Sequence, residues 1–392
     1  MSKLLQTLLV GVGGYGATYA NYLLSGEFDA DLQLTGVVDP FAKTSSCYEQ
    51  LIKKNIPIYD SMEAYFAKHK ADLTIISTPI HLHYDQCSIA LENGSNVLCE
   101  KPLVPNLEAL DKLEQKRGDK LLAVGFQWCY STVMQTLKKR ILSKEFGKAL
   151  NLKCYVSWPR NWAYYSRGVN WAGKIKSANG DLIHDSIASN ATAHYIQNML
   201  FLLGADMESA ASLTNIQAEC YRANDIESFD TIAFKGKAGE AEIYYTASHA
   251  TYNEIHPVMD YTFENARIWI NVRNQDFICT VHHKDGRVED LGHGLGEGEI
   301  NRVRFMVKRL KGEEAHVCTA QTARPITALI DSIFNQAKFH SFPSNIIIKD
   351  TEKEATYVQN LHLDLWDCFS RNQLPSEMGF NWSQKASEII CN

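Results

Sequence analysis

Three short motifs in the first hundred residues have the residue types and spacing to support chemistry: a glycine-rich turn, an isolated acid and a Glu-Lys-Pro tripeptide. The turn, Gly11-Val12-Gly13-Gly14-Tyr15-Gly16, follows an apolar run at residues 5–10. Gly11 permits a tight turn, Gly13 lets the backbone approach a pyrophosphate, and Gly16 lets the next helix pack on the sheet. Backbone amides and the helix dipole would bind the phosphates. A plain glycine-rich turn is the alternative, but the strand before the motif and the amphipathic stretch after it favour a dinucleotide site.

The isolated acid is Asp39, which ends a second apolar run at residues 32–38. An acid at this place accepts hydrogen bonds from both hydroxyls of an adenosine ribose. The carboxylate would repel a 2'-phosphate, and the nearest basic residue is Lys43, so the sequence favours NAD over NADP. A carboxylate before Pro40 could also serve only to form a turn.

The composition is typical of a globular enzyme. The chain has 392 residues, of which 45% are hydrophobic, enough for two domains or one large domain. No apolar run approaches the roughly 20 residues of a membrane span, and the N-terminal residues lead into a strand rather than a secretion signal, so we expect no membrane contact and a cytoplasmic location. The ten cysteines occur singly, which predicts reduced packing residues and no metal site. The net charge of -6 argues against binding to nucleic acid.

The first third of the chain predicts a doubly wound parallel sheet. Short apolar runs alternate with helix-length segments, at residues 5–10, 32–38, 73–77, 96–99 and 121–124. Ligands of such sheets bind at the carboxyl ends of the strands. Four groups of residues follow the runs and should meet at that edge: Asp39, Thr78-Pro79, Glu100-Lys101-Pro102 and Gln127.

After about residue 130 the pattern changes to that of an open, mostly antiparallel sheet. Strands are expected at residues 152–157, 229–234, 240–248, 259–263, 267–272 and 277–282, several joined by short turns with Gly, Asn or Asp. Helices are expected at residues 186–203, 323–339 and 353–369. The whole chain is therefore predicted to be an α/β protein.

With these motifs the chain resembles the Gfo/Idh/MocA family of glucose-fructose oxidoreductase, inositol dehydrogenase and rhizopine-catabolism proteins, which are nicotinamide-dependent sugar and polyol dehydrogenases. The matching motifs are Gly11 to Gly16, Asp39, Thr78-Pro79 with His83, and Glu100-Lys101-Pro102. The resemblance implies an NAD-binding Rossmann domain at residues 1–128. It also implies a domain at residues 129–392 for substrate binding and oligomerisation, with a homodimer or homotetramer formed through its sheet. The last helix is expected to pack back on the first domain.

The resemblance places Lys101 beside both the nicotinamide and the reacting carbinol. An ammonium near that positive ring has its charged form disfavoured, which lowers its pKa and suits it to accept a hydroxyl proton as hydride leaves carbon. Glu100 would orient Lys101 or the cofactor amide, and a surface Glu-Lys pair is the alternative. The predicted cofactor-binding residues are Gly11, Gly13, Gly14, Tyr15, Gly16, Asp39, Thr78, Pro79, His83, Glu100, Lys101 and Gln127.

The resemblance also implies an acid and a histidine four residues apart near the start of a helix. Counting back from the helix end at Phe201-Leu202-Leu203-Gly204 puts the histidine at His194 and the acid position at Asn190, on one helix face. Asparagine cannot take a proton, so Asn190 would orient a substrate hydroxyl while Lys101 and His194 carry the proton. Asp185 would cap the helix from Ser186, and a structural histidine is the alternative for His194.

Residues 158–174 form a segment, here called the aromatic loop, that is rich in Trp and Tyr. Aromatic planes pack on the C–H faces of sugars, whereas Arg, Asn and Lys bind hydroxyls. Arg160, Tyr164 and Trp171 are therefore predicted to contact the substrate, and Arg160 with Lys174 could bind a carboxylate. A loop core or an oligomer contact is the alternative.

The sequence thus predicts an NAD-dependent dehydrogenase that acts without metal on a secondary hydroxyl of a sugar, glycoside or cyclitol. One alternative is a lyase or glycosidase-type enzyme whose bound NAD transiently oxidises the sugar and is regenerated. Another is a regulatory protein that binds NAD and sugar without turnover.

Overall fold

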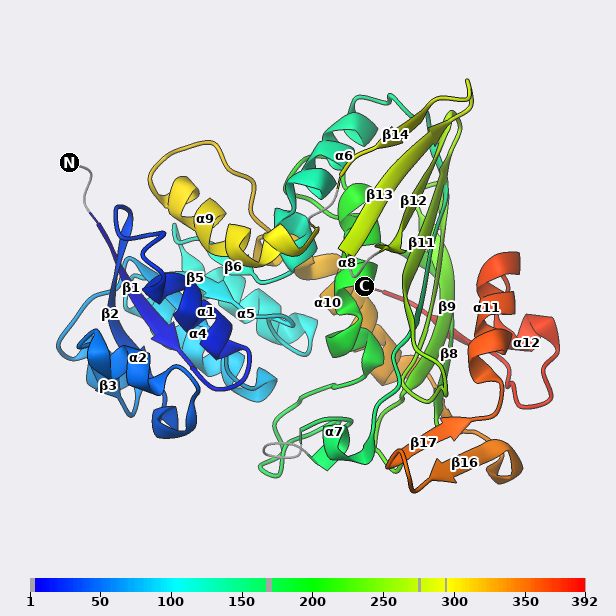
Figure 1. The fold of residues 1–392 in the computed structure, drawn as a ribbon, viewed down its shortest axis with the longest axis horizontal. Helices are drawn as coiled ribbons and strands as arrows, with labels where there is room; N and C mark the ends of the chain where they lie inside the picture. The colour runs from blue at the N-terminus through cyan, green and yellow to red at the C-terminus, as the bar shows by residue number, and fades with distance from the viewer. Residues whose placement is uncertain (1–3, 167–170, 274–275, 293–294, 392) are drawn as a thin grey trace. The chain divides into compact units, whose positions relative to one another are not determined.

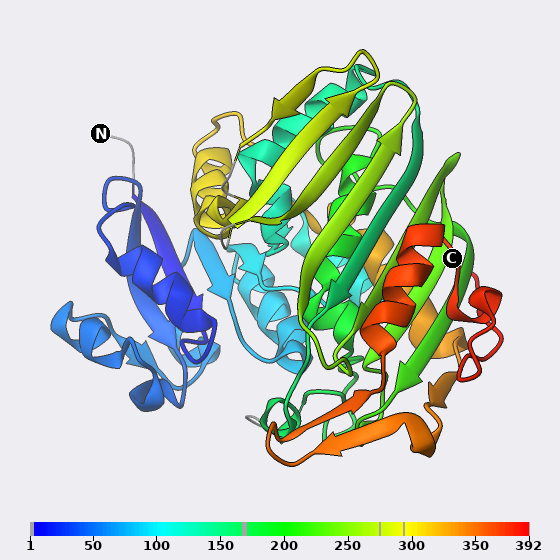
Figure 2. The same ribbon diagram turned by 45° about the vertical axis from the view of Figure 1, so that its right-hand side comes forward.

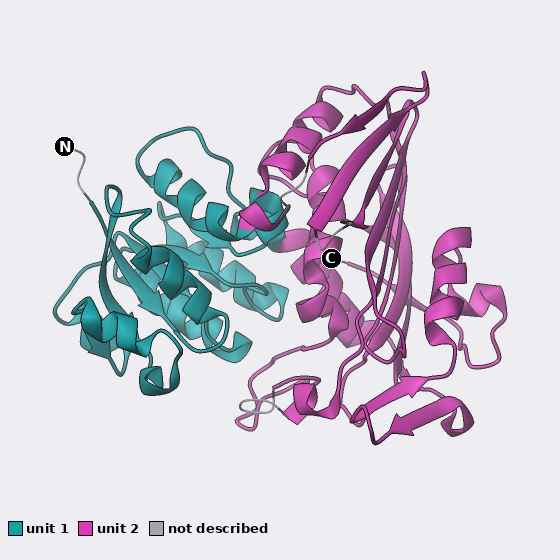
Figure 3. Cartoon of the chain, viewed as in Figure 1, with its two compact units in different colours: residues 1–130, 299–323 teal, residues 131–298, 324–392 magenta. Residues whose placement is uncertain are grey.

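The computed structural model describes residues 4–166, 171–273, 276–292 and 295–391 and divides into two compact units (Figure 3). Unit 1 comprises Met1–Tyr130 and Glu299–Ala323, and unit 2 comprises Ser131–Gly298 and Arg324–Asn392. The first boundary lies close to the one expected after residue 128. Residues 299–323 differ from expectation, because helix α9 (Gly298–Leu310) buries Arg302 in unit 1 rather than in the second domain.

Unit 1 is built on a six-stranded sheet with the order β3-β2-β1-β4-β5-β6, and every neighbouring pair is parallel. The doubly wound parallel sheet is therefore confirmed. The order reverses between β1 and β4, which is where such sheets bind ligands. The strands are β1 (Leu5–Val10), β2 (Leu32–Val38), β3 (Ile58–Tyr59), β4 (Leu73–Ile76), β5 (Asn96–Cys99) and β6 (Leu122–Val124).

Helices and short 3₁₀ turns connect these strands (Figure 1). The α-helices are α1 (Gly16–Leu24), α2 (Tyr48–Lys53), α3 (Met62–Phe66), α4 (His83–Glu92) and α5 (Leu107–Arg117). The 3₁₀ turns are Ala42–Thr44, Ile80–Leu82 and Gln127–Tyr130. Local capping explains where α5 lies: the Asn106 side chain accepts a bond from the amide of Ala109, and Gly118 at φ +56° ends the helix.

Unit 2 is built on a ten-stranded sheet with the order β14-β13-β12-β11-β7-β10-β9-β8-β15, and β18 also pairs with β8. The pairs β7–β10 and β8–β15 are parallel and the others are antiparallel, so the predicted open, mostly antiparallel sheet is confirmed. The strands are β7 (Ala149–Ser157), β8 (Thr214–Arg222), β9 (Thr231–Ala238), β10 (Ala241–Ser248), β11 (Ile255–Phe263), β12 (Ala266–Arg273), β13 (Asp276–His283), β14 (Val288–Asp290), β15 (Phe339–Ser341) and β18 (Ser387–Ile389).

The remaining elements of the chain include two that differ from the sequence prediction. The helix expected at residues 186–203 is a π-helical turn, Ile187–Ala191, followed by α8 (Ala193–Leu202). The helix expected at residues 353–369 begins only at α11 (Leu361–Arg371), because β17 (Ala355–Val358) pairs with β16 (Ile347–Asp350). The other helices are α6 (Thr132–Leu142), α7 (Trp162–Ser166), α10 (Ala320–Gln336) and α12 (Pro375–Met378), with 3₁₀ turns at Leu295–Glu297 and Ser344–Ile346.

Helices cover both faces of the large sheet. Helices α8 and α10 lie on one face, and α11 and α12 lie on the other (Figures 1 and 2). The apolar side chains of α11 pack on Tyr155 of β7 and Tyr244 of β10, and the Tyr155 hydroxyl donates to the carbonyl oxygen of His362 at 2.8 Å. The C-terminal helix α11 therefore packs on the sheet of unit 2, because its apolar face matches these tyrosines.

The hydropathy of the helices and the state of the cysteines are both addressed by the sequence predictions. No helix in the described ranges is both long and apolar enough to cross a membrane. All ten cysteines lie in the described part of the chain as free thiols, and nine of them are buried, as expected for packing residues.

Candidate functional site in unit 1

The glycine-rich turn joins β1 to α1 at the carboxyl edge of the parallel sheet. Gly11 has φ +84°, and a Cβ there would lie 2.5 Å from the carbonyl oxygen of Ser77. A Cβ on Gly16 would collide with the carbonyl oxygen of Gly11. In contrast, the space beside Gly13 and Gly14 is open, with no atom within 4 Å of an added Cβ. Packing therefore requires Gly11 and Gly16, and the open stretch between them fits the close approach of a pyrophosphate.

Asp39 ends β2 and is half-buried. Its Oδ2 accepts a hydrogen bond from the amide of Val12 at 2.8 Å, and its Oδ1 accepts one from the amide of Phe41 at 2.8 Å. The carboxylate thus ties the end of β2 to the glycine turn, which is the turn-forming role. A carboxylate has about four lone-pair sites, so acceptor capacity remains for ribose hydroxyls.

Glu100 lies in a buried polar cluster that the sequence did not reveal. Its Oε1 accepts from the Tyr19 hydroxyl at 2.7 Å and forms an ion pair with Arg302 of α9. Arg302 is only 1% exposed, and its Nη2 donates to the Tyr15 hydroxyl at 2.5 Å. Its guanidinium also lies 4.8 Å from the ring centroid of Tyr19. A buried guanidinium is tolerated only when it is paired and hydrogen-bonded, and this cluster supplies both requirements.

Glu100 connects this cluster to Lys101 through the backbone. Its carboxylate is engaged by Arg302 and Tyr19, and it reaches Lys101 through the backbone amide, which donates to Oε2 at 3.2 Å. Burial raises the pKa of Tyr15 and of Tyr19, so both phenols stay protonated at neutral pH. The cluster therefore links the glycine turn, α1 and the residue before Lys101 through fixed hydrogen bonds.

His83 lies behind this edge of the sheet and is only 1% exposed. Its Nδ1 lies 2.8 Å from the carbonyl oxygen of Pro102, and its Nε2 lies 2.9 Å from that of Thr78. Burial lowers the pKa of His83, so the ring is neutral and can donate to only one of these carbonyls. The ring joins the loop after β4 to the loop after β5.

The other predicted cofactor residues lie on the loops at the same edge. Thr78 follows β4, and its hydroxyl donates to Oε1 of Gln86 at 2.5 Å. Pro79 precedes the 3₁₀ turn Ile80–Leu82, and Gln127 begins the turn that follows β6. Lys101 is half-buried on the loop after β5. Unit 1 thus brings the predicted set to one edge of one sheet.

Candidate functional site in unit 2

The π-helical turn changes the expected relation between Asn190 and His194. Thr192, at φ -115° and ψ 8°, separates the turn that holds Asn190 from helix α8, which holds His194. The two residues therefore do not share one regular helix face, as their spacing had suggested. Turns of this type occur frequently at functional sites.

Asp185 and Asn190 lie in direct contact. The Asn190 amide donates to Oδ1 of Asp185 at 3.0 Å, and Oδ2 of Asp185 accepts from the amide of Gly173 at 2.6 Å. Asp185 does not cap the helix as expected, because the Ser186 side chain accepts the bond from the amide of Ser189 at 3.1 Å. A carboxylate thus lies next to the predicted acid position, where it holds the Asn190 side chain by a hydrogen bond.

The first part of the aromatic loop forms a stack that reaches α8. The Trp158 ring lies 5.8 Å from the ring of Tyr195, next to His194. The Arg160 guanidinium lies 5.6 Å from the Trp158 ring and 5.1 Å from the Tyr164 ring. The Tyr164 ring in turn lies 5.6 Å from that of His249. Arg160 and Tyr164, both predicted to contact substrate, are therefore neighbours.

The second part of the aromatic loop is arranged differently. Residues 167–170 lie outside the described residues. Trp171 is half-buried and accepts, through its carbonyl oxygen, a bond from the amide of Lys174 at 3.2 Å. The Lys174 ammonium pairs with Glu227 at 2.9 Å, and Lys174 does not line the cavity that Arg160 lines.

A cavity of about 590 Å³ lies beside the stack. It is lined by Pro159, Arg160, Asn161, Tyr164, Lys353 and Ala355. Lys353 and Ala355 come from the β16–β17 hairpin, where the sequence pattern predicted a helix. The sequence therefore missed Lys353 as a neighbour of Arg160.

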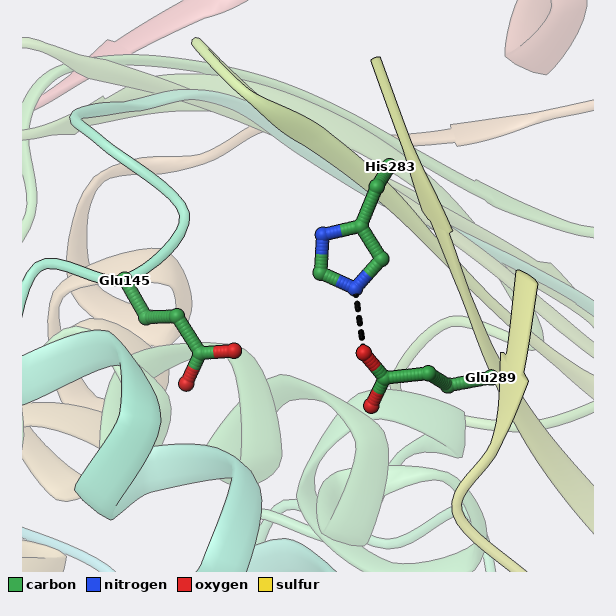
Figure 4. Close-up of side chains that lie close together, drawn as sticks. All are labelled: Glu145, His283 and Glu289. Atoms are coloured by element: carbon green, nitrogen blue, oxygen red, sulfur yellow. Dashed lines mark hydrogen bonds and ion pairs between the residues drawn. The ribbon is translucent and has the colours of Figure 1, made fainter. Parts of the chain in front are cut away.

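One group of possible metal ligands comes together among the described residues, namely Glu145, His283 and Glu289 (Figure 4). His283 Nε2 lies 2.6 Å from Oε1 of Glu289. Arg140 pairs with both carboxylates, at 2.5 Å from Glu145 and 2.9 Å from Glu289. These hydrogen bonds and ion pairs use the ligand atoms, so the group is an ion-pair network and we assign no metal to it.

Comparisons with known proteins show which proteins this chain is similar to. Residues 5–126 match the model of the oxidoreductase family GFO_IDH_MocA, described as an NAD-binding Rossmann fold. An inositol 2-dehydrogenase of Corynebacterium glutamicum (strain R) is 29% identical over 159 residues, which cover 39% of this chain and 45% of that enzyme. One from Mycolicibacterium smegmatis is 31% identical over 157 residues, covering 38% and 44%. The chain thus spans less than half the length of these curated relatives.

Solved structures share the fold over most of the chain. The WlbA dehydrogenase of Bordetella pertussis, in complex with NADH and UDP-GlcNAcA, matches with a TM-score of 0.70 at 18% identity, covering 85% of this chain and 96% of that one. An oxidoreductase of Agrobacterium radiobacter, in complex with NAD+, L-tartaric acid and magnesium, matches with a TM-score of 0.68 at 16% identity and the same coverage. The resemblance to the Gfo/Idh/MocA family is confirmed, and residues 5–126 carry the NAD-binding Rossmann fold of that oxidoreductase family.

Proposed function

We propose that the protein is an NAD-dependent dehydrogenase that acts on a secondary hydroxyl of a sugar, glycoside or cyclitol. The observation that carries the proposal is the edge of unit 1 at which the open glycine turn follows β1, Asp39 follows β2 and Lys101 lies on the loop after β5. The family match and the inositol 2-dehydrogenases among the relatives support this class of reaction.

The residues of unit 1 fit the cofactor. The backbone at Gly13 and Gly14 would bind the pyrophosphate, and Asp39 would accept the ribose hydroxyls, which favours NAD over NADP. Bound NAD supplies the hydride acceptor. Tyr15, which is 40% exposed, with Thr78, Pro79 and Gln127, would complete the binding edge. His83 acts as a positioning residue, because its ring holds two of the loops together.

The proton chemistry is assigned to Lys101 and His194. Lys101 would accept the proton of the substrate hydroxyl as the C–H bond breaks, and His194 would assist as a second proton-transfer group. The backbone bond from Lys101 to Glu100, together with the Glu100–Arg302 pair, fixes the chain next to that lysine. Asn190, anchored by Asp185, would orient a substrate hydroxyl. Arg160, Tyr164 and Trp171 are the proposed substrate contacts of the aromatic loop.

Assembly and compartment complete the proposal. A homodimer or homotetramer formed through the large sheet would use strands on the β12–β13 side, because α11 covers β7 and β10. Light scattering of the purified protein measures that state. The free thiols of all ten cysteines support a reducing compartment such as the cytoplasm.

A panel of cyclitols, neutral sugars and sugar acids, incubated with the protein and NAD, tests the function. We expect NADH absorbance to rise with at least one member, together with the matching ketone. Product without net NADH would favour the lyase or glycosidase-type enzyme. NAD binding without any product, measured by calorimetry, would favour the regulatory protein.

A further inference from the structure

We propose that the cavity beside the aromatic loop binds an oxyanion, either carboxylate or phosphate, carried by the substrate. The inference rests on the proposed function, because the oxyanion belongs to the sugar or polyol that the dehydrogenase oxidises. Two of the six lining residues, Arg160 and Lys353, are cationic, and none is acidic. A cavity of about 590 Å³ has room for a sugar-sized ligand.

Arg160 is held in place, yet it retains bonding capacity. Its guanidinium stacks against Trp158 and Tyr164, and its backbone amide donates to the carbonyl oxygen of His249 at 3.1 Å. Its Nε is buried and has no hydrogen-bond partner among the described residues. Within the described ranges, the Arg160 side chain makes one hydrogen bond, from Nη1 to the carbonyl oxygen of Pro159, and this bond is long at 3.5 Å. A buried donor without a partner is unfavourable, and a ligand acceptor would remove that cost.

Further donors lie on the same loop. The indole Nε1 of Trp158 and the hydroxyl of Tyr165 are also buried without a partner among the described residues. Oδ1 of Asn161 accepts from the amide of Tyr164 at 3.1 Å, which leaves the Nδ2 group of Asn161 as a donor in the cavity lining. Among the residues that line the cavity, Arg160, Asn161 and Lys353 offer donors, which favours a ligand rich in acceptors.

The second cation, Lys353, is fixed near Arg160 by the β16–β17 hairpin. Asn161 and Ala355 form a backbone bridge, and the Trp162 indole donates to the Thr356 hydroxyl at 2.9 Å. The Lys353 ammonium lies 3.4 Å from the Tyr252 ring centroid and makes no ion pair with a described residue.

The carboxylates of the hairpin do not neutralise the cavity. Oδ1 of Asp350 accepts from the amides of Glu352 and Lys353, each at 3.0 Å, so this carboxylate forms the turn. Glu352 and Glu354 are exposed and do not line the cavity. The planar guanidinium of Arg160 matches the two oxygens of a carboxylate or phosphate, whereas a single hydroxyl would engage only part of it.

Calorimetric titration of the full chain, with and without NAD, tests the proposal by using glucose, glucuronate and glucose 6-phosphate as ligands. We expect at least one of the two anions to bind tenfold or more tightly than glucose, and the comparison of the two distinguishes carboxylate from phosphate. Raising NaCl from about 0.01 M to about 1 M, which shortens the Debye length from about 30 Å to about 3 Å, should weaken anion binding but not glucose binding. Equal binding of the three ligands, or no anion binding, would overturn the proposal.

Substitutions test which residues cause the preference for an anionic ligand. Arg160→Gln should abolish the preference for the anion, and Lys353→Gln should reduce it by a smaller factor. Arg287→Gln is the matched control, because Arg287 is 62% exposed at the edge of the sheet, and Lys174→Gln tests the lysine that the sequence had paired with Arg160. An unchanged preference in Arg160→Gln would contradict the assignment. If circular dichroism shows that this variant does not fold, Arg160→Lys is used instead. Lysine keeps the positive charge without the two parallel N–H donors of the guanidinium, and it should show an intermediate preference.

The same experiments distinguish a failure of the oxyanion site from a failure of the dehydrogenase assignment. Anion binding that depends on Arg160, without any reduction of NAD, would leave the oxyanion site standing and overturn the dehydrogenase assignment. Reduction of NAD by neutral sugars alone, with no preference for anions, would support the dehydrogenase assignment and overturn the oxyanion site.

Discussion

Two arginines, one in each unit, show how the surroundings of the same side chain lead to different roles. Arg302 of unit 1 is 1% exposed and has a carboxylate and a phenol of the chain as partners. Arg160 of unit 2 is half-buried between two rings, and its buried Nε has no partner among the described residues. The hydrogen bonds of Arg302 are completed by groups of unit 1 itself. Arg160 is held in position but keeps donors without a protein partner in the described part of the chain, so it is suited to bind a ligand.

The largest effect is expected next to the Arg302 cluster, at the residue whose backbone the cluster holds. Lys101→Met should lower kcat by about 10²–10⁴-fold, because it removes the proposed proton acceptor. NAD affinity, measured by calorimetry, should stay within about threefold of the original, since Met keeps the length of the side chain. A variant with full turnover would remove Lys101 from the chemistry and leave the cluster with a purely structural role.

Removing Arg302 should damage the fold. Arg302→Met leaves Glu100 buried without its cation, and we expect the free energy of unfolding to fall by about 3–5 kcal/mol. Arg304→Met is a matched control on the same helix: Arg304 is 40% exposed and pairs with Glu27, so its loss should cost about 0–1 kcal/mol. Chemical denaturation measures both. An equal loss of unfolding free energy in the two variants would show that the buried Arg302–Glu100 pair contributes no more than the exposed Arg304–Glu27 pair.

Arg160→Gln should show the opposite behaviour from Arg302→Met. We expect its free energy of unfolding to change by less than about 1 kcal/mol, since Arg160 makes no ion pair with a described residue. KM for an anionic substrate should rise by about tenfold or more, as expected for losing a hydrogen bond to a charged group. A large loss of unfolding free energy with an unchanged KM would instead give Arg160 a structural role like that of Arg302.

The smallest effect concerns His83, which links two loops of unit 1. Burial lowers its pKa from 6.5, so the unfolded chain binds a proton more readily than the folded chain. The stability that depends on the neutral ring is therefore present above about pH 6.5 and is lost as the pH falls towards the folded pKa. In His83→Gln we expect a flatter loss of unfolding free energy between neutral and mildly acidic pH, measured by denaturation at several pH values. An identical slope in both proteins would exclude this contribution.

Local sequence signals predicted the parts of the structure that local physics determines. The strands β1, β2 and β5 have the predicted bounds, because buried parallel strands appear as unbroken apolar runs. Strand β3 has only two residues, too few to give a pattern. The loops at the sheet edge were predictable because parallel strands bring their carboxyl ends together.

The missed features depend on long-range contacts. Arg302 lies on an amphipathic helix with other basic residues, and its long-range contacts with Glu100, 202 residues away, and with Tyr15 place it in the interior. The residues 355–358 satisfy a helical pattern as part of a longer run, but pairing with β16 makes them a strand and brings Lys353 near Arg160. The turn at Ile187–Ala191 departs from regular α geometry, which residue spacing alone does not reveal.

The return of residues 299–323 to unit 1 has a consequence for synthesis. On the ribosome, Glu100 is made 202 residues before Arg302, a delay of roughly 10 to 40 s at about 5–20 residues per second. Throughout this interval the Glu100 carboxylate lacks the cation that pairs with it in the complete chain. Completion of the first folding unit therefore waits for translation of all of Ser131–Gly298, so most of unit 2 is synthesised before unit 1 is complete.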